Sequence, residues 1–106
     1  DNELWVAPAL LPLWPQLVRA ALRYRLAPQR LDAAAAHAAR HGHRGLYVPW
    51  QSAVTGDPVD LVPPMNNLEV HVGGCVAHLL HLYLNATEGG DLPSLDEGLG
   101  SLQTLV

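Results

Sequence analysis

The sequence contains no lysine, and all six of its basic residues are arginines. Charged residues make up only 15% of the 106 residues, and the formal net charge is −4. A mildly acidic chain without a concentrated basic surface is not typical of a nucleic-acid-binding protein. Because hydrophobic residues reach 49%, so few charges predict helices buried on more than one side, as in the middle of a larger protein.

The sequence also lacks the features of membrane, secreted and disulfide-bonded proteins. No stretch reaches the ~18 consecutive apolar residues that indicate a membrane span. Residues 1–15 carry acidic side chains and three prolines, unlike a secretory signal. The single cysteine, Cys75, excludes a disulfide within the chain and is expected to be a buried, reduced side chain. These features favour a cytoplasmic protein. Since the chain lacks an initiator methionine and ends in an apolar stretch, we expect an internal fragment of a longer protein.

The residue patterns predict helix after helix, and therefore an all-α class. Residues 3–13 are apolar but interrupted by prolines, which predicts a short or kinked helix. Pro15 suits the first position of a helix over residues 15–26. One face of that helix is marked by Leu17, Val18, Ala21, Leu22 and Arg25.

Two more helices are expected. Pro28 begins an alanine-rich run of high helix propensity, which should end at Gly42 in a left-handed conformation. A last helix is predicted over about residues 68–85, although Gly73-Gly74 lowers its propensity and requires compensation. Its apolar face is formed by Val72, Val76, Leu79, Leu80 and Tyr83.

Residues 42–67 are rich in glycine and proline and are predicted to form one long loop, with room for a brief strand at residues 46–48. Loops of this length in a compact domain are usually functional or disordered. Tyr47 and Trp50 favour an ordered, packed loop. Trp50 can either stack on a sugar ring or hold the loop against the helices, and composition does not decide between the two.

Six histidines raise the question of a metal site. His37 and His41 are spaced i, i+4 and His78 and His81 i, i+3, but no third ligand or His-Glu-x-x-His motif accompanies them. We therefore predict no metal, a polar helix face for the first pair and a partly buried face for the second. For Glu69, complementation of a helix dipole is favoured over a role in chemistry.

Four segments carry a family resemblance. Asp-Asn-Glu-Leu-Trp-Val-Ala-Pro (1–8) resembles the Asp-x-Glu-x-Trp-x-x-Pro segment of glycoside hydrolase family 65, and Leu-Arg-Tyr-Arg (22–25) its Leu-x-Tyr-Arg helix end. Val-Pro-Trp-Gln-Ser-Ala-Val-Thr-Gly (48–56) is similar to its Phe-Pro-Trp-Glu-Ser-Ala-x-x-Gly, and Glu-Val-His-Val (69–72) follows in order. The resemblance extends to about residue 91 and is strongest to the acid-trehalase-like branch, which includes the protein-glucosylgalactosylhydroxylysine glucosidases.

The resemblance implies a fold and a reaction. The fold is part of an (α/α)6 barrel, completed by the remaining helices of a parent catalytic domain. The reaction is hydrolysis, with inversion and without a cofactor, of a terminal α-glucosyl unit on galactosyl-hydroxylysine of collagen-type chains. An inverting hydrolase needs two carboxyl groups about 6.5–9.5 Å apart. In the family, both lie beyond residue 106, so this chain is expected to contain no catalytic residue and to be inert alone.

By the same resemblance, Asp1 is the first candidate for a glucose-binding residue. Glu3 and Trp5 lie beside it, Trp50 and Gln51 belong near the pocket wall, and Glu69 and His71 near the same rim. The carbohydrate-binding residues implied are Asp1, Glu3, Trp5, Trp50, Gln51, Glu69 and His71.

Two departures from the family pattern keep other hypotheses open. Gln51 stands where the family has glutamate, and residues 57–60 read Asp-Pro-Val-Asp in place of Glu-Val-Cys-Pro. The chain can therefore also be a diverged, non-catalytic homologue. A third hypothesis is a small helical interaction module, which would be soluble and monodisperse, whereas a barrel fragment would expose apolar faces.

Overall fold

The computed structural model describes residues 2–59 and 69–89. Within these ranges every regular element is helical, and the one pairing of extended backbone is an isolated bridge between Ser52 and Pro58. The all-α prediction is confirmed. The elements are a π-helical turn η1 (Asn2–Val6) and the helices α1 (Ala7–Leu10), α2 (Pro15–Leu26), α3 (Pro28–Arg40) and α4 (Val72–Ala86).

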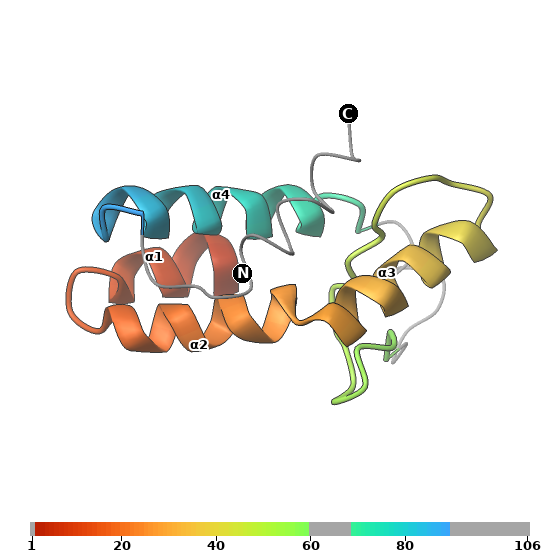
Figure 1. Ribbon diagram of the computed structural model, residues 1–106, viewed down its shortest axis with the longest axis horizontal. Helices are drawn as coiled ribbons and strands as arrows, with labels where there is room; N and C mark the ends of the chain where they lie inside the picture. The colour runs from red at the N-terminus through yellow and green to blue at the C-terminus, as the bar shows by residue number, and fades with distance from the viewer. Residues whose placement is uncertain (1, 60–68, 90–106) are drawn as a thin grey trace.

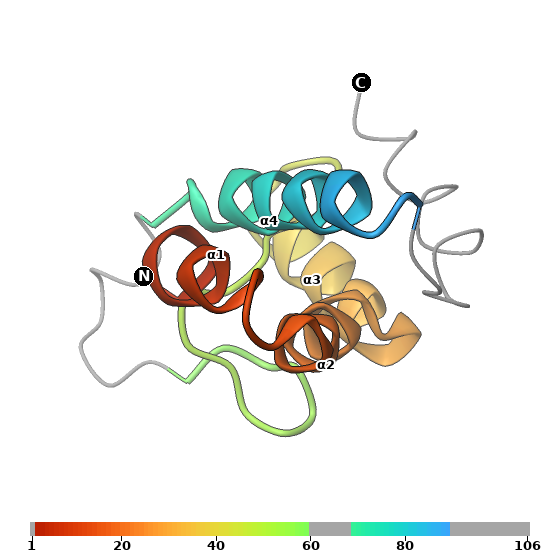
Figure 2. The same cartoon turned by 90° about the vertical axis from the view of Figure 1, so that its left-hand side faces the viewer.

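Three of the helices lie side by side, and the fourth extends beyond them. α4 runs along α1 and α2, while α3 continues past the end of α2 (Figures 1 and 2). Ala27 separates α2 from α3 in an extended conformation, with φ −59° and ψ 136°. Because the residue before a proline avoids the helical region, Pro28 ends one helix and begins the next.

The core is formed where α2 faces α4. Val18 and Leu22 from α2 and Leu79 from α4 are almost completely buried, and burial of such side chains is the main stabilising term of the fold. All five residues of the predicted α4 face are buried. On α2, however, Leu17 is 52% exposed, so the predicted face is correct at Val18 and Leu22 and wrong at Leu17.

The end of α3 follows the prediction in detail. Gly42 has φ +75°, and its backbone N–H donates to the Ala39 carbonyl at 3.0 Å. The N–H of His43 donates to the Ala38 carbonyl, also at 3.0 Å. These two bonds are the Schellman motif, which satisfies the last carbonyls of a helix and favours glycine at the left-handed position.

Two details of α4 differ from expectation. The helix begins at Val72, so the predicted start near residue 68 is wrong. Residues 70–71 form a turn instead, and residue 68 lies outside the described ranges. A Cβ added at Gly73 would only reach ordinary contact with Val48, at 4.0 Å. Close packing therefore does not compensate for the two glycines. Their position in the first turn limits the loss of helix stability, because few intrahelical hydrogen bonds depend on them.

The structure describes residues 42–59 of the predicted long loop. Residues 42–59 contain no helix and no strand, so the strand considered at residues 46–48 is absent. Residues 60–67 of the predicted loop lie outside the described ranges. None of the described helices is long and apolar enough to cross a membrane.

Substitution at Leu22 tests the core. Leu22 is 0% exposed, so Leu22→Ala removes buried methyl groups and leaves a cavity, which should lower the free energy of unfolding by about 2–5 kcal/mol. Thermal unfolding of the full-length protein measures the change as a lower midpoint. Leu22→Met conserves the volume and should cost less than about 1.5 kcal/mol; an equal effect of both variants would contradict this account of the core.

Candidate functional site

A hollow of about 270 Å³ opens where η1, α2 and the loop after α3 meet. It is lined by Asn2, Glu3, Ala21, Tyr24, Arg25, Trp50 and Ser52. All of them except Ala21 come from three of the four segments in which the sequence shows its family resemblance, residues 1–8, 22–25 and 48–56. Segments far apart along the chain therefore build one surface.

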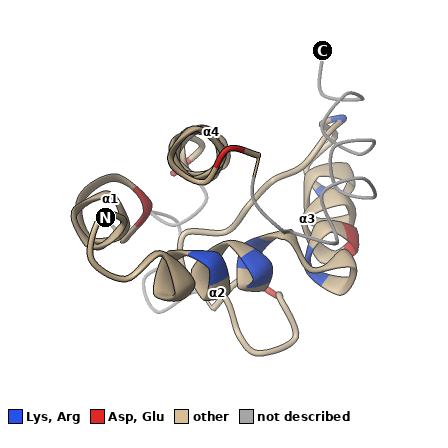
Figure 3. Ribbon diagram, turned by 60° about the vertical axis from the view of Figure 1, so that its left-hand side comes forward, with Lys and Arg blue, Asp and Glu red and all other residues tan. Residues whose placement is uncertain are grey.

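An ion pair joins these three segments. The Arg25 Nε donates to Glu3 Oε1 at 2.8 Å, and Arg25 Nη1 donates to the backbone carbonyl of Pro49 at 3.1 Å. Glu3 is buried and the Arg25 side chain is only 14% exposed. Five of the six arginines of the sequence belong to α2 and α3, where Figure 3 shows blue segments on both helices. A guanidinium that bonds in two directions thus fixes the loop relative to η1.

Glu3 is held as a carboxylate. Its burial alone would raise its pKa, but the hydrogen bond and the positive charge of Arg25 outweigh burial, and the pKa lies below its ordinary value of 4.5. An ionised carboxylate accepts hydrogen bonds, for example from sugar hydroxyls, and has no proton to donate at neutral pH. Glu3 is therefore suited to binding and not to acid catalysis.

The loop presents Trp50 at this hollow. Trp50 is 41% exposed, whereas its neighbour Pro49 is buried. Pro49 therefore packs the loop onto the helices and leaves the Trp50 ring accessible. Gln51 is also exposed, and its backbone carbonyl accepts a hydrogen bond from the Val59 N–H at 3.0 Å.

Three other predicted residues lie away from the hollow. Trp5 is 70% exposed and does not line the hollow. Glu69 and His71 precede α4 and contact each other, with Glu69 Oε2 3.2 Å from His71 Nδ1; neither lines the hollow. Asp1 lies outside the described residues. The hollow thus unites Glu3 and Trp50 of the seven predicted residues.

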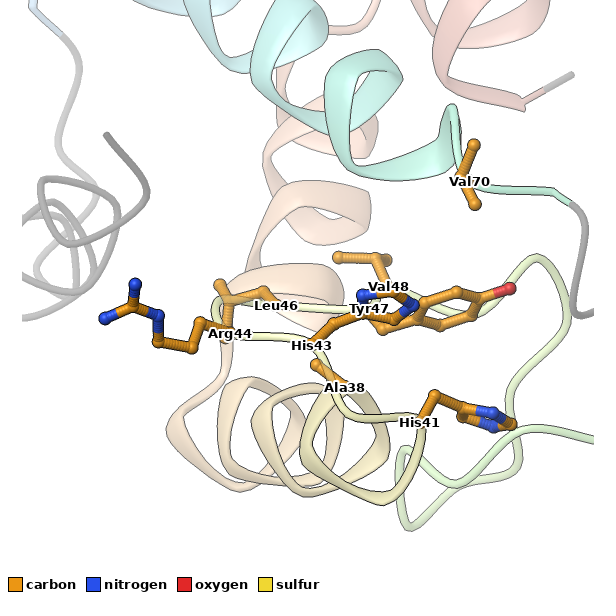
Figure 4. A pocket seen from close by; sticks show the side chains of 8 residues that line it. All are labelled: Ala38, His41, His43, Arg44, Leu46, Tyr47, Val48 and Val70. Carbon is orange, nitrogen blue, oxygen red and sulfur yellow. The ribbon is translucent and has the colours of Figure 1, made fainter.

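A second hollow, of about 370 Å³, lies beside the end of α3. Figure 4 shows the Tyr47 ring between Val70 and His41. Next to it the His37 ring lies 4.5 Å from the Tyr47 ring and 4.7 Å from the His41 ring. His37 is buried, so the polar helix face predicted for this histidine is wrong.

The histidines of α4 also differ from prediction. His78 and His81 are both exposed, because the buried face of α4 is occupied by its apolar residues alone. Cys75 is buried, as predicted. Within residues 2–59 and 69–89, no group of three or more His, Cys, Asp or Glu side chains is arranged to hold a metal ion.

Comparison with known proteins identifies the family. The model of the glycosyl hydrolase family 65 central catalytic domain matches residues 1–100. The chain belongs to glycosyl hydrolase family 65. No solved structure matches it. The described helices are consistent with a fragment of the (α/α)6 barrel that this family implies.

Individual relatives agree with that assignment. The chain is 35% identical over 103 residues to the protein-glucosylgalactosylhydroxylysine glucosidase of Danio rerio, and 32% identical over 98 residues to that of Gallus gallus. The alignments cover 95% and 92% of this chain, but only 15% and 14% of the two relatives. A kojibiose hydrolase of Flavobacterium johnsoniae is 40% identical over 78 residues, 73% of this chain and 11% of the relative. The chain therefore spans about a seventh of the two glucosidases.

The Glu3–Arg25 pair makes stability depend on pH. Because the folded pKa of Glu3 lies below 4.5, the pair contributes fully above about that pH and loses its contribution as the pH falls through the lower folded value. Glu3→Gln should cost about 2 kcal/mol at neutral pH, the net value of a hydrogen bond to a charged group. Unfolding of both proteins between pH 3 and 7 should show this difference shrinking in acid. A difference that stays constant across the range would contradict the charged pair.

Proposed function

We propose that this chain forms one wall of the glucose pocket in an inverting α-glucosidase, which releases a terminal glucosyl unit from glucosylgalactosyl-hydroxylysine. The observation that carries the proposal is the hollow in which a buried, ionised Glu3 and an exposed Trp50 meet. An aromatic face beside a carboxylate suits a sugar, because the ring carbons pack on the indole and the hydroxyls donate to the oxygen atoms.

The relatives support this substrate class. Two relatives that the chain matches over more than nine-tenths of its length are named as protein-glucosylgalactosylhydroxylysine glucosidases. A second candidate substrate is kojibiose, since kojibiose hydrolases match 73% of the chain at 37% and 40% identity. A kojibiose phosphorylase, at 32% identity, adds phosphate as a rival to water as the attacking group.

Three of the predicted residues then have a proposed role at the hollow. Trp50 stacks on the glucose ring, and Glu3 accepts from a hydroxyl group while it orients Arg25. Gln51 presents a neutral amide where the family pattern has a charged glutamate. The full proposed set remains Asp1, Glu3, Trp5, Trp50, Gln51, Glu69 and His71. The general acid and base are proposed to belong to parts of the protein outside this chain.

The remaining helices of the parent domain are the proposed partner. Large apolar side chains are exposed along η1, the turn after α1 and the start of α2. They are Leu4, Val6, Leu13, Trp14 and Leu17. Because α1 contacts both η1 and α2, these exposed apolar side chains are proposed to form an interface that the parent domain covers. No nucleic acid and no cofactor enter the proposal, and a cytoplasmic location stays part of it.

Activity of the full-length protein is the first test. The complete reading frame containing this chain is expressed and incubated with glucosylgalactosyl-hydroxylysine, kojibiose and trehalose, and the products are analysed for glucose, its anomer and glucose 1-phosphate. We expect free β-glucose from the first substrate. Release of glucose from kojibiose alone would make kojibiose the proposed substrate. Formation of glucose 1-phosphate would indicate phosphorolysis. A folded protein that forms no product would favour a non-catalytic homologue.

Trp50→Ala tests the pocket wall. Loss of a stacking partner should weaken binding by roughly 1–2 kcal/mol, which raises KM about tenfold and leaves kcat nearly unchanged. Steady-state kinetics with the best substrate measures both values. Val54→Ala is the control on the same loop, because Val54 is 87% exposed and does not line the hollow. An equal rise of KM in both variants would contradict the assignment.

Expression of the chain alone tests whether the parent domain covers its exposed apolar side chains. We expect residues 1–106 to self-associate in size-exclusion chromatography with light scattering, because the apolar side chains that the parent domain would cover are exposed. Replacing Leu13 and Leu17, 67% and 52% exposed, by serine should reduce this association. A monodisperse wild-type monomer would favour the small interaction module.

A further inference from the structure

The loop that carries Trp50 is internally rigid. The N–H of Ala53 donates to the Asp57 carbonyl at 2.8 Å, and the N–H of Val59 donates to the Gln51 carbonyl at 3.0 Å. Ser52 and Pro58 form the isolated bridge between its two arms. In Figure 1 this loop projects from beneath the junction of α2 and α3. A loop tied to itself in this way moves as a unit, so contacts at one point determine the orientation of the rest.

Tyr24 provides one such contact. Its hydroxyl oxygen lies 2.6 Å from Ser52 Oγ, 3.3 Å from the Ser52 carbonyl oxygen and 3.2 Å from the Ala53 carbonyl oxygen. One arrangement satisfies the hydroxyl groups: Ser52 donates to the Tyr24 oxygen, and Tyr24 donates to a backbone carbonyl.

Arg30, on α3, contacts both the Tyr24 ring and the loop. Its guanidinium carbon lies 3.7 Å from the centre of the Tyr24 ring, a close cation–π contact. Its Nη1 also donates to the Ala53 carbonyl at 3.2 Å. That oxygen further accepts from the Gly56 N–H at 2.9 Å, so donors from α2, α3 and the loop converge on it.

Gly56 shows how closely the loop approaches Arg30. A Cβ at this position would lie 3.2 Å from both the Cα and the Cγ of Arg30, and Gly56 has φ +95°. Only glycine adopts this backbone conformation without strain while leaving that space empty. The loop therefore lies directly on the backbone of α3 at Arg30.

We propose that Arg30 is a positioning residue for the sugar pocket, one that sets the orientation of Trp50 through Tyr24 and the Ala53 carbonyl. This rests on the proposed function of the hollow. Trp50 lies between two anchored points, because Arg25 holds the Pro49 carbonyl on one side and Tyr24 with Arg30 holds Ser52 and Ala53 on the other. Arg30 itself does not line the hollow.

Such a residue acts by preorganisation. A tryptophan fixed in its binding orientation loses little side-chain and loop freedom when the sugar arrives, so more of the stacking energy appears as affinity. Loss of Arg30 leaves the reacting groups untouched and lets the loop sample other orientations. The expected consequence is weaker substrate binding at an unchanged chemical step.

The test compares Arg30→Gln with Arg23→Gln in the full-length protein. Both remove one positive charge, but Arg23 is exposed on α2 and does not line the hollow. Arg30→Gln should raise KM roughly tenfold with kcat nearly unchanged, the pattern of lost binding, and Arg30→Lys should fall between it and the wild type. A purely structural role would instead lower the active fraction, and therefore kcat, at constant KM; that result would overturn the proposal.

A double-mutant cycle and an activity-independent measurement complete the test. If Arg30 acts through Trp50, adding Arg30→Gln to Trp50→Ala should change KM by less than about twofold, because the two effects are not additive; a full further rise overturns the proposal. Hydrogen exchange at the amides of Ala53, Gly56 and Val59 should be faster in Arg30→Gln and unchanged in Arg23→Gln. If the wild-type protein releases no glucose, the proposed function fails, and this exchange result alone supports or overturns the positioning by Arg30.

Discussion

The candidate site depends on the ion pair between Glu3 and Arg25. The two residues are 22 positions apart along the chain, and their 2.8 Å contact joins η1 to the end of α2. Arg25 extends the connection to the loop through the Pro49 carbonyl. A buried pair of this kind requires both partners, because removing one leaves an unpaired charge in a site of low polarity. The position of the hollow therefore follows from one charged contact more than from any apolar one.

The helices and the loop are held by different forces. α2 and α4 are joined by apolar side chains around Leu22 and Leu79, an interaction without directional preference. The loop is oriented by Arg25 and Arg30, whose guanidinium groups each serve two partners. Arg25 bonds to Glu3 and Pro49, and Arg30 stacks on Tyr24 while it bonds to Ala53. A lysine ammonium lacks the planar, forked donors for such double contacts, so arginine at these two positions has a physical reason.

The sequence predicted what is local and missed what is tertiary. α2 and the end of α3 follow from Pro15, Pro28 and Gly42, whose effects act within one or two residues. Burial of His37 could not be read from an alanine-rich helix, because almost every face of it looks alike. The motifs named three segments that meet at the hollow, and Glu3 and Trp50 both line it; their part in binding a sugar stays a prediction. The contacts of Tyr24 and Arg30 with the loop were missed, since spacing along the chain does not reveal contacts between residues 23 to 29 positions apart.

The ionisation of Glu3 limits what this part of the protein can do. Of the described residues that line the hollow, Glu3 is the one carboxylate, and Arg25 keeps its pKa below the ordinary value. A general acid in glycoside hydrolysis needs a raised pKa, so that it carries a proton at neutral pH. The contact that assembles the hollow is thus the same contact that makes Glu3 unsuitable as the acid. Under the proposed function, binding and chemistry are therefore divided between segments: this one holds and orients the sugar, and another segment of the catalytic domain supplies the proton.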